Sequence, residues 1–316
     1  MMRALRTFVV LLAIGCGTET VSTTSGTGGQ GGAAGSGGSP PSADCWSASL
    51  DRWELEPFDI NTLAGDMPRD PMLSGDGLTL YYAAISENGF PRVYEAQRAQ
   101  RDLPFEGGVL LAEWLGQNPL GHPWRIGDEL FMAEDNNAGA FHVVVSTFDG
   151  STWSLPAPPG ALINEGFTNS DPTLTQDGLR IVFTHQSAAR VAGRLAEGAR
   201  SDAAAGTPFS TFSEVVIPSV APENFVVCPT FSPDGLKLFF STVDTTSGDQ
   251  ALVWMTTRQS LDHAWEAPVH IAAFDDASQH TCMHSLSSDG CEVWLERFTV
   301  AVPNAKYTIA KRSPIP

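Results

Sequence analysis

A repeated segment built around an Asp-Gly turn constrains the fold of this chain more than any other feature. The turn aspartates stand at positions 76, 128, 177, 234 and 289, which are 52, 49, 57 and 55 residues apart. A period of that length is typical of propeller blades. Four close copies read DPMLSGDGLTLYYAA (70–84), DPTLTQDGLRIVFTH (171–185), CPTFSPDGLKLFFST (228–242) and MHSLSSDGCEVWLER (283–297), and a degenerate copy reads HPWRIGDELFMAED (122–135).

Each copy predicts a β-hairpin. Asp-Gly between two apolar runs favours a tight turn, because glycine tolerates positive φ and aspartate can accept a hydrogen bond from its own backbone. The run after each turn has apolar or aromatic residues on both alternating faces, as expected for a sheet packed between two others. A third strand is predicted in each copy at 92–98, 141–148, 194–200, 251–257 and 306–312, and a fourth follows Phe105, Trp153, Phe212 and Trp265.

The fifth copy of the outermost strand is missing after residue 312, and a matching segment occurs near the beginning of the repeat region, at 53–58. An N-terminal strand that completes the last blade would close the ring and hide its edges. We therefore predict an all-β chain that forms a β-propeller of five four-stranded blades, closed by that N-terminal strand. Six blades are the alternative count.

The SPDG-type hairpins and the aromatic strands that follow them resemble TolB-like, WD-repeat-like propeller repeats of bacterial envelope lipoproteins. The resemblance covers about residues 48–313 and implies the fold. It implies little about activity, because related repeats serve as docking surfaces, sensor domains, enzyme appendages and polysaccharide-degrading catalysts.

The N-terminal region reads as an export signal followed by an anchor. Residues 1–15 combine Arg3 and Arg6 with an apolar run too short to span a bilayer, which is typical of a signal peptide. The run ends in AIGC and resembles a lipobox, so Cys16 is the predicted lipidation site. Residues 16–43 are rich in Gly, Ser and Thr and predict a flexible tether before a propeller domain at 44–316. In the bacterial lipoproteins that this segment resembles, Asp directly after the lipidated cysteine commonly retains the protein in the inner membrane. Gly17 stands at that place here, so the resemblance implies the outer membrane, with the folded domain in the periplasm or at the cell surface.

The charge excludes one class of partner. A formal net charge of -18 would repel nucleic acid, and it gives no basic patch for an anionic membrane. Membrane attachment is therefore expected through the lipid alone.

Four further cysteines, Cys45, Cys228, Cys282 and Cys291, are an even number in an exported chain and favour disulfides. Three pairings are possible. No CxxC pair occurs, which argues against a structural zinc site.

Candidate functional residues lie six positions before each turn aspartate, on the predicted innermost strand. They are Asp70, His122, Asp171, Cys228 and Met283. Asp70, His122 and Asp171 are candidate binding residues of the central channel, and Asp70 and Asp171 are candidate catalytic carboxylates for glycoside cleavage. The alternative is that both aspartates, each followed by proline, hold turns or bond a neighbouring blade.

The HTCMH segment offers a possible metal site. His280, Cys282 and His284 would point the same way on a regular strand, with His122 nearby. The alternative is a disulfide between Cys282 and Cys228, with the histidines bonded to loop carbonyls. We predict no cofactor.

Two functions remain open from sequence. The favoured one is a non-catalytic envelope lipoprotein whose propeller binds a protein or a glycan. The other is a five-bladed, glycoside hydrolase-like enzyme that uses the channel carboxylates.

Overall fold

The computed structural model describes most of the propeller region. The predicted signal peptide, Cys16 and the predicted tether lie outside the described residues. Among the described residues, no helix is long and apolar enough to cross a membrane. The described ranges are 45–46, 50–59, 62–87, 89–111, 118–135, 140–161, 163–164, 168–186, 193–221, 224–243, 250–276, 278–299 and 302–312.

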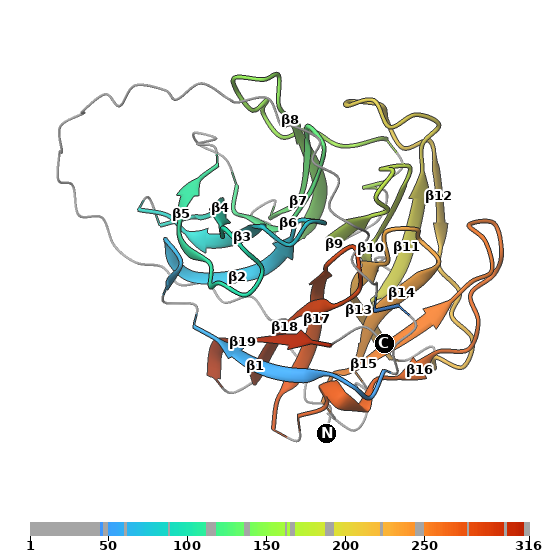
Figure 1. The fold of residues 1–316 in the computed structure, drawn as a ribbon. Coiled ribbons are helices and arrows are strands. Elements are labelled where there is room, and N and C mark those ends of the chain that lie inside the picture. The colour runs from blue at the N-terminus through green and yellow to red at the C-terminus, as the bar shows by residue number, and fades with distance from the viewer. Residues whose placement is uncertain are drawn as a thin grey trace, which may run out of the picture. The chain divides into compact units, whose positions relative to one another are not determined.

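Five antiparallel sheets follow one another around a central axis (Figure 1). The first strand of each sheet is innermost and contacts the first strand of the next sheet, and the fifth returns to the first. This closed ring confirms the predicted five-bladed β-propeller. The innermost strands are β2 (Asp66–Leu73), β6 (Leu120–Ile126), β9 (Thr168–Leu174), β13 (Phe225–Phe231) and β17 (His280–Leu286).

The remaining strands follow outward in chain order. The second strands are β3 (Thr79–Ile85), β7 (Glu129–Asp135), β10 (Arg180–Gln186), β14 (Lys237–Val243) and β18 (Glu292–Thr299). The third strands are β4 (Pro91–Gln97), β8 (Phe141–Thr147), β11 (Arg194–Ala199), β15 (Leu252–Thr257) and β19 (Val302–Lys311). The outermost strands are β5 (Glu106–Leu110), β12 (Thr211–Glu214), β16 (Val269–His270) and, for the last blade, β1 (Glu54–Phe58), and a short 3₁₀ helix, η2 (Ala272–Phe274), follows β16.

The second blade has the least regular outer edge. Its sheet has the order β6-β7-β8, whereas the other four sheets have four strands. Two isolated bridges, between Val145 and Ala157 and between Phe148 and Trp153, connect the following segment to β8 where a fourth strand would run. Pro156, Pro158 and Pro159 in that segment lack the amide hydrogen that a continuous ladder needs.

The first described strand closes the ring, as predicted. β1 pairs antiparallel with β19 from Glu54 opposite Lys311 to Phe58 opposite Tyr307. A disulfide between Cys45 and Cys291 fastens the segment before β1 to the turn of the same blade. The N-terminal segment therefore belongs to the last blade both by hydrogen bonding and by a covalent link.

The Asp-Gly turns have one recurring hydrogen-bond pattern. In the first blade the Ser74 hydroxyl donates to Asp76 Oδ1 over 2.6 Å, and the same carboxylate oxygen accepts from the Leu78 backbone N–H over 3.0 Å. Gly77 follows with φ of 75°, a conformation that suits glycine. The same contacts recur at the turns of Asp177, Asp234 and Asp289. The degenerate second copy has Ile126 in place of the hydroxyl residue.

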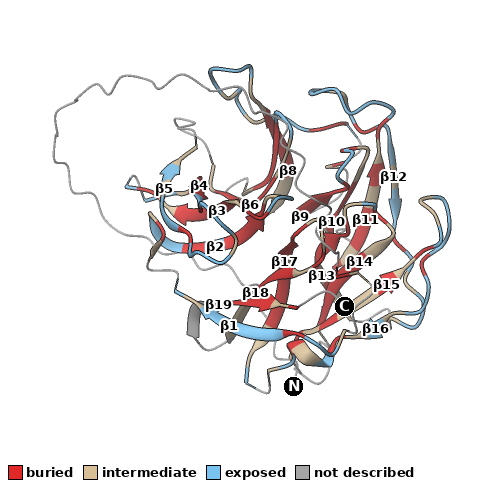
Figure 2. Cartoon of the chain, in the orientation of Figure 1, coloured by how far each residue is buried: buried red, intermediate tan, exposed pale blue. Residues whose placement is uncertain are grey.

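The hydrophobic core lies between neighbouring blades. Trp294 of β18 is 1% exposed, and its ring lies 5.8 Å from that of Phe105 in the first blade and 4.7 Å from that of Phe58 in β1. Figure 2 shows the inner strands buried and β1, β5 and β12 largely exposed. Burial on both faces explains why the second strands carry apolar residues at consecutive positions.

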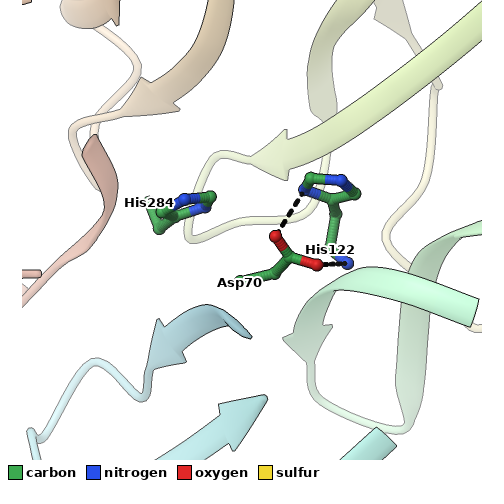
Figure 3. A group of neighbouring side chains, drawn as sticks. All are labelled: Asp70, His122 and His284. Atoms are coloured by element: carbon green, nitrogen blue, oxygen red, sulfur yellow. Dashed lines mark hydrogen bonds and ion pairs between the residues drawn. The ribbon is translucent and has the colours of Figure 1, made fainter. Parts of the chain in front are cut away.

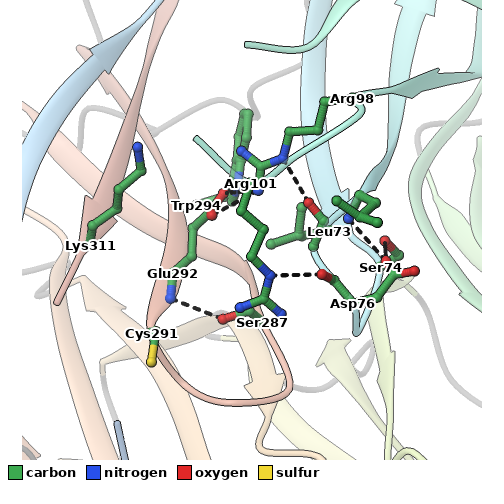
Figure 4. Close-up of polar contacts among 12 residues, drawn as sticks. Leu73, Ser74, Asp76, Arg98, Arg101, Ser287, Cys291, Glu292, Trp294 and Lys311 are labelled. Carbon is green, nitrogen blue, oxygen red and sulfur yellow. Dashed lines mark hydrogen bonds and ion pairs between the residues drawn. The ribbon is translucent and has the colours of Figure 1, made fainter. Parts of the chain in front are cut away.

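A buried arginine links each of several blades to its neighbour. Arg98 follows β4, donates from Nε to the Gly77 carbonyl over 2.7 Å, and contacts both Glu292 oxygens from Nη2 over 3.0 and 2.8 Å. Its guanidinium also lies 4.5 Å from the centre of the Phe105 ring. Figure 4 shows this network at the seam between the first and last blades. Charge-assisted, bidentate pairing of this kind fixes the relative position of the two sheets.

Equivalent arginines occur at three other blades. Arg200 pairs with Glu129, Arg258 pairs with Glu197, and Arg312 donates to the Gly290 carbonyl. In the second blade Phe148 takes the place of the arginine. Its backbone N–H donates to the carbonyl of Asp128 in the turn, whereas the backbone N–H of each arginine donates to the carbonyl of the residue that follows the turn glycine. The arginines at 98, 200 and 312 end three of the predicted third strands, so their recurrence was visible in the sequence.

Candidate functional site

The candidate site is built by a backbone irregularity that four inner strands share. Asp70, His122, Asp171 and Cys228 each have a positive φ, between 48° and 53°, and each precedes a proline. The strand pairing shifts at each of these positions. A β-bulge redirects side chains, and non-glycine residues seldom adopt this conformation unless the surroundings impose it. In the last blade the irregularity falls at His284, between Met283 and Ser285.

These residues line one small cavity in the central channel. Its volume is about 20 Å³, and its wall includes Asp70, His122, Asp171, Cys228, Met283 and His284. The five positions predicted to face the channel therefore do line it. A cavity of this volume has room for about one water molecule.

His122 is the centre of the charged contacts. Its Nδ1 lies 2.7 Å from Asp171 Oδ1 and 3.4 Å from Asp70 Oδ1. The backbone N–H of His122 donates to Asp70 Oδ2 over 3.2 Å, and the Ser170 hydroxyl donates to Asp171 Oδ2 over 2.8 Å. Both candidate catalytic carboxylates therefore contact the same imidazole nitrogen.

The electrostatics favour a protonated imidazole between two ionised carboxylates. Burial alone would lower the pKa of His122, but the charges of Asp171 and Asp70 raise that pKa to about 9. Burial would raise the pKa values of both aspartates, but the nearby His122 charge holds the pKa of each below its usual range.

His284 forms a second pair beside the first. Its Nε2 lies 2.6 Å from Glu296 Oε2 on β18, and its ring stacks at 6.2 Å from the His122 ring. Burial would lower the pKa of His284, but the Glu296 carboxylate raises it. Glu296 is absent from the sequence-based candidates, because it lies on a second strand expected to pack between blades. The sequence feature that could have placed Glu296 near the channel is its position opposite Cys282 in the hairpin of β17 and β18.

The HTCMH segment does not form the metal cluster considered from sequence. The strand irregularity at His284 breaks the alternation that would align it with residues 280 and 282. Within the described part of the chain, the group with metal-ligand geometry is Asp70, His122 and His284. His280 instead accepts a hydrogen bond at Nδ1 from the Ala251 backbone N–H over 2.9 Å. The expected bond from the histidines to loop carbonyls is therefore wrong for His280.

The cysteines pair as two disulfides. Cys228 of β13 is bonded to Cys282 of β17, and Cys45 is bonded to Cys291. The first pair is the alternative considered for Cys282, and it links two neighbouring inner strands beside the cavity. Cys282 is thereby removed as a metal ligand.

The similarity of this chain to known proteins lies in its fold. No protein-family model matches the sequence, and no curated protein matches it. Among solved structures, TolB from Acinetobacter baumannii is 12% identical, with a TM-score of 0.50 over 78% of this chain and 56% of that one. The endo-arabinase from Bacteroides thetaiotaomicron VPI-5482 is 16% identical, with a TM-score of 0.52 over 80% and 98%. A thermostable family-43 glycoside hydrolase is 12% identical, with a TM-score of 0.53 over 82% and 98%.

At these identities the likeness concerns fold, and the same fold serves both TolB and glycoside hydrolases. The closed ring of five sheets, the N-terminal closing strand and the repeated Asp-Gly hairpins together identify the chain as a five-bladed β-propeller, whose fold is similar to those of TolB and of a family-43 glycoside hydrolase.

Proposed function

We propose that this chain is an exported, lipid-anchored envelope protein whose propeller binds a protein or a glycan without transforming it. The observation that supports the proposal is the set of contacts that the candidate catalytic carboxylates make in the channel. Asp70 and Asp171, the two candidate catalytic carboxylates, both contact His122 in the channel cavity.

Glycoside cleavage also needs one carboxylic acid that stays protonated to donate its proton. The pKa values of Asp70 and Asp171 are both lowered, so both are ionised at neutral pH. This arrangement supports a role in joining blades over a role in catalysis. The glycoside hydrolase-like enzyme remains the alternative, because family-43 enzymes share the fold.

The proposed contact surface is the end of the channel where β2 begins. Met67 of β2 is 52% exposed and Phe90, just before β4, is 46% exposed. The two lie at the same end of the first blade, because Asp66 pairs with Ile85 and Ile85 pairs with Pro91. Exposed aromatic and thioether side chains at a propeller end are typical of contact residues in binding surfaces.

A matched pair of variants tests this surface. Phe90→Ala should weaken binding at least tenfold, since aromatic anchors dominate interface energies. Leu103→Ala is the control, because Leu103 is 44% exposed at the opposite end of β4. The probes are peptidoglycan sacculi, arabinan and xylan by co-sedimentation, and envelope proteins by cross-linking in intact cells. Equal binding by Phe90→Ala and wild type, with loss in Leu103→Ala, would place the surface at the other end.

A hydrolysis assay tests the non-catalytic part. The purified chain should release no sugar from arabinan, xylan or peptidoglycan. Hydrolysis that disappears in both Asp70→Asn and Asp171→Asn, with unchanged circular dichroism, would establish the enzyme alternative instead.

The anchor and the outer-membrane location rest on the AIGC segment and on the tether behind it. Wild-type chain should partition into the detergent phase with the membrane fraction, and Cys16→Ala should move to the aqueous phase. Detergent partitioning of Cys16→Ala at the wild-type level would refute lipidation.

A further inference from the structure

Three side chains that commonly bind metals meet in the channel from three different blades. Asp70 of β2, His122 of β6 and His284 of β17 each place one ligand atom within 4.8 Å of the others. Figure 3 shows the three side chains directed toward a common space. All three line the cavity of about 20 Å³, which is suited to a single ion.

The charge around this space is suited to a cation. Asp70 and Asp171 are 7% and 13% exposed, and Glu296 is 15% exposed, so three carboxylates surround two imidazoles. Burying this many carboxylates is costly unless positive charge lies among them. The guanidinium of Arg69 approaches Asp70 only to 3.6 Å, and the Arg69 side chain is 47% exposed. It therefore offsets only part of the negative charge of the carboxylates. In the metal-free chain the protonated imidazole of His122 supplies part of that charge, and a divalent ion bound here would replace the proton and bind the neutral ring.

Outer contacts orient two of the three candidate ligands, His284 and Asp70. Glu296 engages Nε2 of His284 over 2.6 Å, which leaves Nδ1 as the nitrogen for a metal bond. The His122 backbone N–H fixes Asp70 through Oδ2 over 3.2 Å, so Oδ1 is the oxygen turned to the imidazole. Metal-binding histidines and carboxylates normally have such second partners, which set their orientation.

We propose that the central channel binds one divalent first-row transition-metal ion through Asp70, His122 and His284. Two imidazole nitrogens with a carboxylate suit zinc, cobalt or manganese, whereas calcium requires six to eight oxygen ligands. The ion would tie together blades one, two and five. This site is independent of the proposed contact surface at Phe90, so either proposal can fail without the other.

The test uses the purified full-length chain, freed of metal with EDTA. Titration with Co²⁺ should saturate at one equivalent and give visible absorption bands from nitrogen and oxygen ligands. Isothermal titration with Zn²⁺ should give the same stoichiometry, and the melting temperature should rise with Zn²⁺ concentration. His284→Gln and Asp70→Asn should each weaken binding by at least tenfold, because each removes one ligand.

His280→Gln is the matched control, because His280 lies on the same strand as His284 and outside the cluster. It should change the dissociation constant less than twofold. Circular dichroism and melting curves establish that each variant is folded. Absence of saturable binding in the wild-type chain overturns the proposal without reference to any variant. It is likewise overturned if folded His284→Gln binds as tightly as wild type, or if His280→Gln loses as much affinity as His284→Gln.

Discussion

Replacing Arg98 with methionine should destabilise the propeller by about 3 to 5 kcal/mol, the cost of breaking a buried ion pair by removing one partner. The Arg98 and Glu292 side chains are 2% and 6% exposed, so water cannot replace the lost contacts. The substitution removes the bidentate pair with Glu292, the hydrogen bond to Gly77 and the cation–π contact with Phe105. It keeps the apolar stem, so little volume is lost.

The largest part of this cost is the carboxylate left behind. Glu292 would retain one side-chain partner, the indole N–H of Trp294 at 2.9 Å. Replacing Glu292 as well, in Arg98→Met/Glu292→Gln, should therefore recover about 2 kcal/mol, because no unpaired charge remains buried. A coupling of that size between the two sites is expected for residues in direct contact.

Urea denaturation followed by tryptophan fluorescence measures the free energy of unfolding. For a domain of this size the single variant should lower the melting temperature by about 6 to 10 °C. Lys311→Ala is the control, because Lys311 pairs with Glu56 within the last blade over 2.7 Å and the two side chains are 35% and 54% exposed. It should cost less than about 1 kcal/mol. Equal costs for Arg98→Met and Lys311→Ala would refute the idea that the buried seam stabilises the ring.

Three further predictions concern the channel and the closure. In the metal-free chain the pKa of His122 is raised from 6.5, the usual value for histidine, to about 9, so protonation of His122 should stabilise the folded state. This stabilisation should be complete below pH 6.5 and should be lost as pH rises through about 9, and it should amount to at most about 3 kcal/mol. Stability from the lowered Asp171 pKa should disappear as pH falls below 3.8, and unfolding curves across pH 3 to 10 without a plateau between these limits would contradict both signs. Cys45→Ser should cost about 5 kcal/mol in the chain-entropy estimate, because the bond closes a loop over a separation of 246 residues, and a melting temperature equal to that of wild type would show that the link adds nothing. Deleting residues 1–59 removes β1 and should destabilise the chain by several kcal/mol, whereas deleting 17–40 should not, so equal melting temperatures for the two truncations would contradict closure by β1.

Much of the fold could be predicted because the information is local and repeated. The turn at Asp76 has its own glycine and hydroxyl partner, and the same pattern returns at Asp177, Asp234 and Asp289. The second blade shows where this reasoning weakens. Its turn lacks the hydroxyl residue, and Phe148 replaces the recurring arginine. Its outer segment contains prolines, and the blade forms three regular strands.

The site was only partly predictable. Counting from the turn placed Asp70, His122 and Asp171 in the channel, because the repeat fixes that distance. His284 and Glu296 depend on a one-residue irregularity in β17 and on a pairing across to β18. Neither follows from alternation along a single strand, since a bulge reverses the face on which later side chains lie.

The pairing of β1 with β19 also determines when the ring can close during synthesis or export of the chain. A chain that leaves the ribosome or crosses a membrane from its N-terminus presents β1 before the other strands of the propeller, while Lys311, the partner of Glu54, emerges after the other blades. During that interval β1 is an open strand edge near other chains. Its acidic residues Glu54 and Glu56 and its Pro57 are features that discourage pairing with the wrong strand. The ring can therefore close only after β19 has emerged, and until then the unpaired strand is one whose residues disfavour aggregation.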